Sequence, residues 1–412
     1  MSTVAEEALK GSLEDLDLND PGLFADGPPH ALFARMRAEA PVLWNRPTEI
    51  NDGFWSVTGY ADEVAVVNDW KTFSSARRGI FLQEEGILPK EFTSFLFSMM
   101  DPPDHDKHRA ILNKVFTPRA VAAREADIRA VITELLDAVI ERGECDFVTD
   151  VAVLFPLAVT ANMLGIPHAD RGKLFDWTNK MADVSLPPEQ GLVMMQEMAA
   201  YLLGLINERR ERPEDDLLSR LIEAEVDGTA LNDIEIVAHF AQLMAGGNET
   251  TRNAVAGGLL VLMDNPDQRQ ALRDDPALIG GAVEEILRWH TPIMHNVRTA
   301  TRAAVVHGVR IEEGQRLGLW HVAANRDPAA VPDPDVFDVR RVGAKHLAFS
   351  GGRHFCLGNQ LARLELRVAF EETLRRMPDA QPAGPAQRFA NNTFHWMTSL
   401  PVSFSPGPVS VR

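Results

Sequence analysis

Apolar residues recur every three or four positions along most of this 412-residue chain, a spacing typical of helices with one buried face. Between residues 120 and 230 the pattern is interrupted by glycines and prolines, which are common at helix ends. Short β-branched and aromatic segments at residues 54–58, 309–311 and 316–320 predict strands. The pattern therefore predicts a mainly α protein with a small β-rich lobe on the N-terminal side.

The longest helical stretch runs from a capping-box pattern, Asn232 with Glu235, to Asp264, and its apolar character predicts that it crosses the core. At about 1.5 Å per residue this helix is ~48 Å long. Its middle, residues 245–251, reads Ala-Gly-Gly-Asn-Glu-Thr-Thr. Glycine costs about 1 kcal/mol relative to alanine inside a helix, and a buried acid needs partners, so this stretch requires an explanation.

Two interpretations of this stretch remain open. The glycines could allow close helix packing beside a hydrogen-bonded polar pair. Alternatively, Thr250 bonds back to a carbonyl and opens a groove, where glycines let a flat cofactor approach and Glu249 supplies protons through water.

Two segments in the first hundred residues, 1–20 and 79–100, depart from the regular helical pattern. Residues 1–20 are acidic with few apolar anchors and predict a flexible segment, followed by a single domain over residues 21–412. Residues 79–100 are apolar but broken by Gly86 and Pro89. They predict either a buried helical segment or an apolar flap over a ligand pocket.

Composition limits the possible classes of function. The formal net charge of −18 argues against a nucleic-acid partner. Two cysteines cannot build a disulfide framework, which favours the reducing cytoplasm, and Cys145 is interpreted as structural. The sequence has no signal peptide and no apolar run of spanning length, so we expect a soluble protein without a membrane anchor.

The second cysteine, Cys356, lies in Phe-Ser-Gly-Gly-Arg-His-Phe-Cys-Leu-Gly, residues 349–358, just before a helical pattern. A thiol beside the unpaired N–H groups of a helix start is expected to have a lowered pKa and to bind metal as thiolate. Gly358 leaves room for a flat group at the helix start. A lone cysteine is more often a small buried apolar residue, so the spacing has to decide.

The spacing Phe-x-x-Gly-x-x-x-Cys-x-Gly resembles the haem-binding loop of the cytochromes P450. The resemblance implies that Cys356 is the axial thiolate ligand of haem iron, with Phe349 and His354 against the haem. Ser350 stands where glycine is commoner in that loop, and it could alter the turn.

Three further motifs extend the resemblance. In Asp-Pro-Pro-x-His-x-x-x-Arg, His105 and Arg109 share a helix face, which suits a haem propionate. The middle of the long helix resembles the family's acid–alcohol motif, so Glu249 and Thr250 are implied to deliver protons for oxygen activation. Arg298 matches a further propionate-binding position.

The last motif is Glu-x-x-Arg at residues 285–288, which by itself is a common surface pair. In the family the corresponding Glu285 and Arg288 form a buried ion network with a later arginine. Arg341 matches that position, and Arg340 is the alternative.

The resemblance implies a cytochrome P450 fold with the long central helix over a buried haem b. The implied activity inserts one oxygen atom of O2 into a small hydrophobic molecule, such as a terpenoid, an alkyl or fatty chain or a steroid. Because the chain carries no flavin or iron–sulfur motif, electrons are expected from a ferredoxin and its NAD(P)H-dependent reductase. A monomer is expected.

Two groups of residues are assigned by this resemblance. The candidate substrate-binding residues are Phe81, Leu243, Met244, Gly247, Ile293, Val297 and Phe394. The candidate docking face for the redox partner consists of Lys107, Arg109, Lys114, Arg353, Arg363 and Arg367.

Three alternative functions remain. A haem-thiolate peroxygenase would use H2O2 and would not need the acid–alcohol pair. A non-catalytic haem protein that senses or binds a hydrophobic ligand, and a haem-free helical binding protein, are the others.

Overall fold

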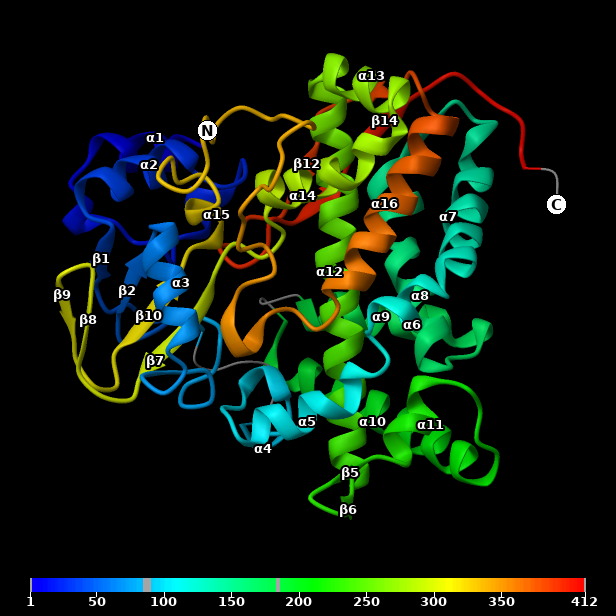
Figure 1. Ribbon diagram of the computed structural model, residues 1–412, viewed down its shortest axis with the longest axis horizontal. Coiled ribbons are helices and arrows are strands. Elements are labelled where there is room, and N and C mark those ends of the chain that lie inside the picture. Colours follow the sequence, from blue (N-terminus) through cyan, green and yellow to red (C-terminus); the bar gives the residue numbers. More distant parts are fainter. Residues whose placement is uncertain (1, 84–89, 183–185, 411–412) are drawn as a thin grey trace.

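One helix, α12 (Asp233–Asp264), runs through the middle of the computed structural model, which describes residues 2–83, 90–182 and 186–410 (Figure 1). Its start is the predicted capping box: the Asn232 side chain accepts from the backbone N–H groups of Ile234 and Glu235, and Glu235 accepts from the Asn232 N–H at 2.8 Å. Helices pack on one side of α12, and the sheet lies on the other.

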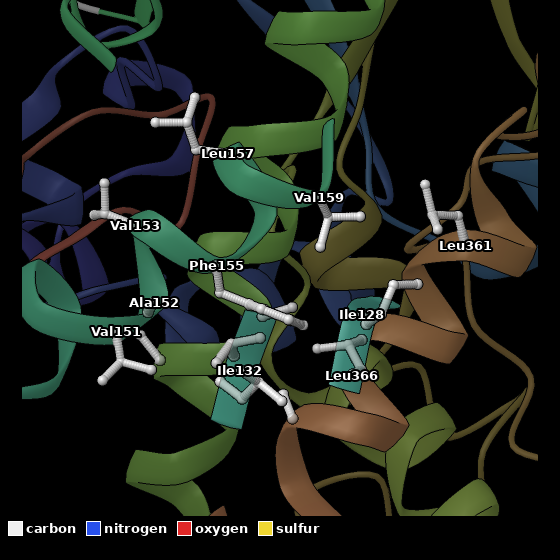
Figure 2. Close-up of a cluster of buried hydrophobic side chains, with 14 of the residues drawn as sticks. Ile128, Ile132, Val151, Ala152, Val153, Phe155, Leu157, Val159, Leu361 and Leu366 are labelled. Atoms are coloured by element: carbon white, nitrogen blue, oxygen red, sulfur yellow. The ribbon is translucent and has the colours of Figure 1, made fainter. Parts of the chain in front are cut away.

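The helical side buries the larger core. Its helices are α6 (Pro118–Ala122), α7 (Glu125–Ile140), α8 (Leu154–Leu164), α9 (Arg171–Ala182), α10 (Pro188–Glu211), α11 (Leu217–Ile222), α13 (Pro266–Asp274), α14 (Ile279–His290) and α16 (Asn359–Arg376). Figure 2 shows Ile132 of α7, Phe155 of α8 and Leu366 of α16 pointing into the space between their helices. All three side chains are fully buried, so this core holds the helices beside α12.

The β-rich lobe is built on one five-stranded sheet, ordered β1-β2-β10-β7-β3. The strands are β1 (Val42–Asn45), β2 (Phe54–Val57), β3 (Phe73–Ser74), β7 (Asn296–Ala300) and β10 (Arg316–Leu319). Only the β2–β10 pair of this sheet is parallel. The remaining α-helices are α1 (Thr3–Lys10), α2 (His30–Glu39), α3 (Tyr60–Asn68), α4 (Lys90–Thr93), α5 (Asp104–Asn113) and α15 (His321–Ala324).

The remaining strands are short. One small sheet has the order β11 (Gln381–Pro382), β14 (Pro401–Ser403) and β4 (Glu144–Asp146). Three pairs complete the set: β5 (Glu225–Val226) with β6 (Thr229–Ala230), β8 (Ala304–Val306) with β9 (Val309–Ile311), and β12 (Gln387–Arg388) with β13 (Met397–Ser399). Helices dominate and strands are confined to these small sheets, which confirms the predicted fold class.

The flexibility of residues 1–20 stays a prediction, although residues 2–20 make specific contacts with the rest of the protein. Ser2 caps α1 by accepting from the Ala5 N–H at 3.2 Å, and Leu18 is fully buried. The Leu18 carbonyl accepts from the Asn392 side chain at 2.9 Å, which joins this segment to the C-terminal part of the chain. Buried leucines, Leu13, Leu16 and Leu18, therefore anchor this acidic segment.

The predicted flap region is described only in part, because Gly86 and Pro89 lie outside the described residues. On its N-terminal side, Leu82 is fully buried, and the Ile80 carbonyl accepts from the Val297 N–H at 3.0 Å. The choice between a flap and a buried helix therefore stays a prediction. Over the described ranges, no helix is both long and apolar enough to cross a bilayer.

Candidate active site

A cavity of about 280 Å³ lies where α12, α16, β7 and the Cys356 loop meet. Its walls are mostly apolar, with a few polar groups. Cys356, Thr250 and Arg298 all line it, although they are far apart in the sequence.

The backbone of the Cys356 loop explains its unusual composition. Ser350 has φ of 55° and Gly352 has φ of 63°, both in the left-handed region that side chains disfavour. A Cβ at Gly352 would lie 2.1 Å from the Val67 carbonyl oxygen of α3. The glycine at 352 is therefore required by both conformation and space. The serine keeps the turn that glycine would make more easily, so the departure from the family pattern leaves the loop intact.

Cys356 sits ahead of α16, and its N–H donates to the Phe349 carbonyl at 3.0 Å. Burial raises the pKa of the Cys356 thiol, while the Gly358 N–H, Arg109 and Arg363 act against that rise. The predicted lowering of this pKa is therefore wrong for the protein alone: the backbone N–H and the cations are present, but desolvation outweighs them.

The α12 wall of the cavity contains Gly246, Gly247 and Thr250. A Cβ at Gly246 would meet no atom within 4 Å, whereas one at Gly247 would approach Thr160 Oγ1 to 3.0 Å. Thr250 Oγ1 donates to the Gly246 carbonyl at 2.8 Å, as the pattern predicted. The helix nevertheless continues as α-helix through this bond, so no break accompanies it.

Glu249 does not line the cavity. Its side chain is 5% exposed and forms an ion pair with Arg252, whose guanidinium lies over the Trp396 ring at 4.8 Å. Burial raises the pKa of Glu249 to about 7, and Arg252 opposes the rise. Glu249 can therefore hold or release a proton near neutral pH, although it is turned away from the cavity.

A different buried acid, which the sequence analysis missed, does line the cavity. Glu365 of α16 is 2% exposed, and Thr251 Oγ1 donates to its Oε2 at 3.2 Å. Burial raises the pKa of Glu365 to about 8, and the bond from Thr251 opposes this. The signal was available: an acid nine residues after Cys356 lies among the apolar positions of its helix.

One end of the cavity gathers cationic and imidazole groups. Arg109 and Arg298 line it, and the rings of His105 and His354 lie 4.3 Å apart by their centroids. Nε2 of each of these two rings is buried without a hydrogen-bond partner among the described residues. Burial lowers the pKa of Arg298 to about 10, with Asp101 acting in the opposite direction. Buried cations and unpartnered ring nitrogens fit an anionic group.

These features together test whether haem fits. Gly358 and Gly246 both face open space at the cavity, where a Cβ would meet nothing within 4 Å. A thiol lines the same cavity, and the unpartnered nitrogens of His105 and His354 lie near its charged end. The residues present therefore fit a flat, dianionic, thiolate-ligated group.

The candidate substrate residues divide into two groups. Leu243, Gly247 and Ile293 line the cavity. The others lie outside its wall: Phe81, Met244, Val297 and Phe394. Met244 and Val297 are fully buried in the core, and Phe394 pairs with Ile293 through an isolated β-bridge. Ile80, one residue before Phe81, lines the cavity instead of Phe81.

The Glu285 network is complete in the structure. Arg288 donates to both carboxylate oxygens of Glu285 at 2.7 Å, and Arg341 Nε donates to Oε2 at 3.1 Å. Arg340 is exposed, so Arg341 is the third member of the network.

The candidate docking face is largely neutralised. Arg353 pairs with Asp106, and Lys107 pairs with Asp227. On α16, Arg363 pairs with an acid of α14, and Arg367 pairs with an acid of α7. Lys114 is exposed, whereas Arg109 turns to the Phe355 carbonyl at 2.6 Å. The six residues therefore do not form one free basic patch.

A mainly helical fold whose central helix and a cysteine loop enclose a cavity fits a haem-thiolate protein. The sequence model of the family described as Cytochrome P450 matches residues 157–378. The chain is 37% identical over 408 residues to the Steroid C26-monooxygenase of Mycobacterium tuberculosis, covering 96% of this chain and 98% of that protein.

Two further proteins agree with this match. The Methyl-branched lipid omega-hydroxylase of Mycobacterium bovis is 36% identical over 388 residues, with 90% of each chain covered. The crystal structure of CYP108D1 from Novosphingobium aromaticivorans superposes with a TM-score of 0.88 at 31% identity, covering 99% of this chain and 100% of that one. The chain belongs to the cytochrome P450 family and is a cytochrome P450 monooxygenase with a haem-thiolate cofactor, which confirms the predicted family, fold and enzyme class.

Proposed function

We propose that this monooxygenase hydroxylates a steroid or a methyl-branched lipid in the cavity beside α12. The similarity to a steroid monooxygenase and to a methyl-branched lipid hydroxylase supports this class. The single observation that carries the proposal is the cavity itself: an apolar wall meets the Cys356 thiol at one place and the Thr250 hydroxyl at another. Such a wall binds an aliphatic substrate by burying its surface.

Cys356 is the group that would hold the haem iron, and bound haem supplies the oxygen-activating chemistry. Arg109, Arg298, His354 and His105 would bind its carboxylates at the charged end of the cavity. The Phe349 ring, which lines the cavity, would pack beside the thiolate.

Protons reach the cavity through this chain's own residues. Thr250 holds a hydroxyl at the cavity wall, fixed by its bond to the Gly246 carbonyl. Glu249 stores a proton behind that wall, since its pKa is raised to about 7 by burial. Because Glu249 is paired with Arg252, delivery requires its carboxyl group to rotate toward Thr250 or to act through water. Electrons come from a ferredoxin and an NAD(P)H-dependent reductase.

A binding experiment tests the substrate class. Purified protein is titrated with cholesterol, a methyl-branched fatty acid and a straight-chain fatty acid, and the low-spin to high-spin shift is recorded. The first two are expected to shift the spectrum at lower concentration than the third. A response to the straight chain alone would contradict the substrate class.

A second experiment tests the site. The reduced, carbon-monoxide-treated protein is expected to show the red-shifted band of sulfur ligation, and Cys356→Ala is expected to abolish it. Cys145→Ala is the matched control, because that thiol is buried outside the cavity and should leave the band unchanged.

The same activity with H2O2 as oxidant is the second candidate. It would not require Thr250 and Glu249, so peroxide-driven turnover that is unaffected by Thr250→Ala would favour it.

A further inference from the structure

A chain of three side chains leads from the interior of the β-rich lobe to the charged end of the cavity. Glu63 of α3 is fully buried, and its Oε2 lies 2.7 Å from His321 Nδ1. Nε2 of the same ring lies 3.1 Å from Asn296 Oδ1. His321 and Asn296 both line the cavity, as does Arg298 two residues further along β7.

The hydrogen bonds of His321 depend on one proton. If the Glu63–His321 pair holds a proton between Oε2 and Nδ1, then Nε2 carries its own hydrogen and donates to Asn296 Oδ1. The Asn296 amide N–H2 is then left facing the cavity as a donor. If that proton is lost, Nδ1–H donates to the carboxylate and Nε2 becomes an acceptor, so the amide must turn its oxygen to the cavity.

The surroundings favour the form that keeps the proton. Glu63 Oε1 is buried without a partner among the described residues, which is far less costly for a neutral carboxyl than for a carboxylate. Burial raises the pKa of Glu63, and the nearby Asp62 and Asp327 raise it further. Burial lowers the pKa of His321 to about 3, with Arg298 acting in the same direction, so the ring does not carry an extra charge of its own.

The charged and titratable groups around this chain come from three elements. Tyr60 and Asp62 lie on α3 beside Glu63, and Asp327 follows α15 and accepts from the Tyr60 N–H at 2.9 Å. On the β7 side, burial and then Arg298 lower the pKa of His321. Burial also lowers the pKa of His295, and His321 acts in the same direction. The acids face Glu63 and the arginine faces the cavity, so both ends favour a neutral pair.

We propose that Glu63 and His321 are positioning residues that turn the Asn296 amide N–H2 toward the anionic edge of the bound haem. The inference rests on the proposed function, because it needs haem carboxylates at the Arg298 end of the cavity. It assigns three residues that no motif of the family resemblance included. Loss of the shared proton at high pH reverses the amide and weakens the hold on the haem.

The first test compares haem loss to an excess of an apo-haem acceptor protein from about pH 6 to about pH 10. Haem loss from the native protein is expected to accelerate as pH rises more than it does from Glu63→Gln, whose side chain cannot ionise. Asp62→Asn is the matched control, because it leaves Glu63 able to ionise. Its haem loss should still accelerate with pH, but from a lower pH than in the native protein, since Asp62 helps to raise the pKa of Glu63. Parallel profiles for the native protein and Glu63→Gln would overturn the proposal.

The second test is a double-mutant cycle. Asn296→Leu and His321→Phe should each speed haem loss by about tenfold, the effect of losing one hydrogen bond to a charged group. The double variant should be no faster than the faster single variant, because both act through one amide. Additive effects would show that the two residues act independently and would overturn the relay.

A third measurement does not depend on the folding of Asn296→Leu or His321→Phe. In the diamagnetic ferrous carbon-monoxide form, ¹⁵N-imidazole signals report which ring nitrogen of His321 is protonated, and Glu63→Gln identifies the signal by shifting it. Protonated Nε2 near neutral pH supports the proposal, and bare Nε2 overturns it. Each sample is first checked for the band of sulfur ligation: its absence contradicts the proposed function, whereas a normal band with bare Nε2 contradicts only the relay.

Discussion

Two buried Glu–Arg pairs with the same i,i+3 spacing lie on neighbouring helices, yet they are built differently. Glu285 of α14 accepts from Arg288 twice, from Arg341 and from the Asp338 N–H at 3.1 Å, so four donors surround its carboxylate. Glu249 of α12 has an ion pair with Arg252 and a long 3.4 Å contact from Asn248. The first pair is a saturated structural clamp.

The second pair leaves the carboxyl group only partly compensated. Burial therefore prevails at Glu249 and raises its pKa to about 7, despite a guanidinium in contact. The comparison shows that helical spacing alone does not decide how fully the charge of a buried carboxylate is compensated. The number of donors supplied by other elements decides it.

Breaking the clamp should have the largest effect. Arg288→Ala removes the paired charge and two of the four donors from a fully buried carboxylate, together with bonds to three carbonyls, so we expect a loss of about 3–5 kcal/mol in the free energy of unfolding. Urea unfolding of the haem-bound protein measures it. A loss below about 1 kcal/mol would show that the network is not a clamp.

Removing the acid from the second pair should affect turnover rather than folding. Glu249→Gln keeps the shape and removes the proton store, so turnover should fall by about 10²-fold. Product and hydrogen peroxide are measured per NAD(P)H consumed. The variant is expected to form more hydrogen peroxide and less product per NAD(P)H than the native protein. Native turnover in this variant would exclude Glu249 from proton delivery.

The Arg252 contact should set the pH at which Glu249 works. Arg252→Gln removes the group that holds the pKa of Glu249 down, so turnover should persist to higher pH than in the native protein. The pH–rate profile measures this shift. A profile that moves to lower pH would contradict the assigned role of Arg252.

The same raised pKa predicts a change in stability with pH. Because the folded-state pKa of Glu249 is above its ordinary value, its contribution to stability is complete below about pH 4.3 and is lost as pH rises through about 7. The free energy of unfolding of the native protein should therefore fall relative to Glu249→Gln over that window. Unfolding curves at several pH values measure the difference, and a constant difference would contradict the assignment.

The smallest effect distinguishes two adjacent arginines. Arg341→Ala removes one donor to Glu285 and bonds to three carbonyls, and we expect it to cost about 1–3 kcal/mol. Arg340→Ala is the matched control, with an expected effect within about 0.5 kcal/mol, because its side chain is exposed. Equal costs for both would contradict the assignment of Arg341.

Local patterns predicted the elements that depend on neighbouring residues. The capping box at Asn232, the back-bond of Thr250 and the tight loop before Cys356 each arise within a few positions of the chain. The four motifs, in their order, were also enough to identify the family. Several surroundings were not predicted: burial raises the pKa of Cys356, residues 2–20 make specific contacts, and Phe81, Met244, Val297 and Phe394 lie outside the cavity wall.

Glu63, His321 and Asn296 show why such surroundings are not predicted from the sequence. They come from α3, α15 and β7, more than 230 positions separate the first from the others, and no local spacing relates them. The sequence by itself determined the helices, the turns and the thiol at a helix start, because these depend on hydrogen bonds and backbone angles within one turn. Only the tertiary structure decided which carboxyl groups keep a proton, because desolvation and donors from distant elements set their charge.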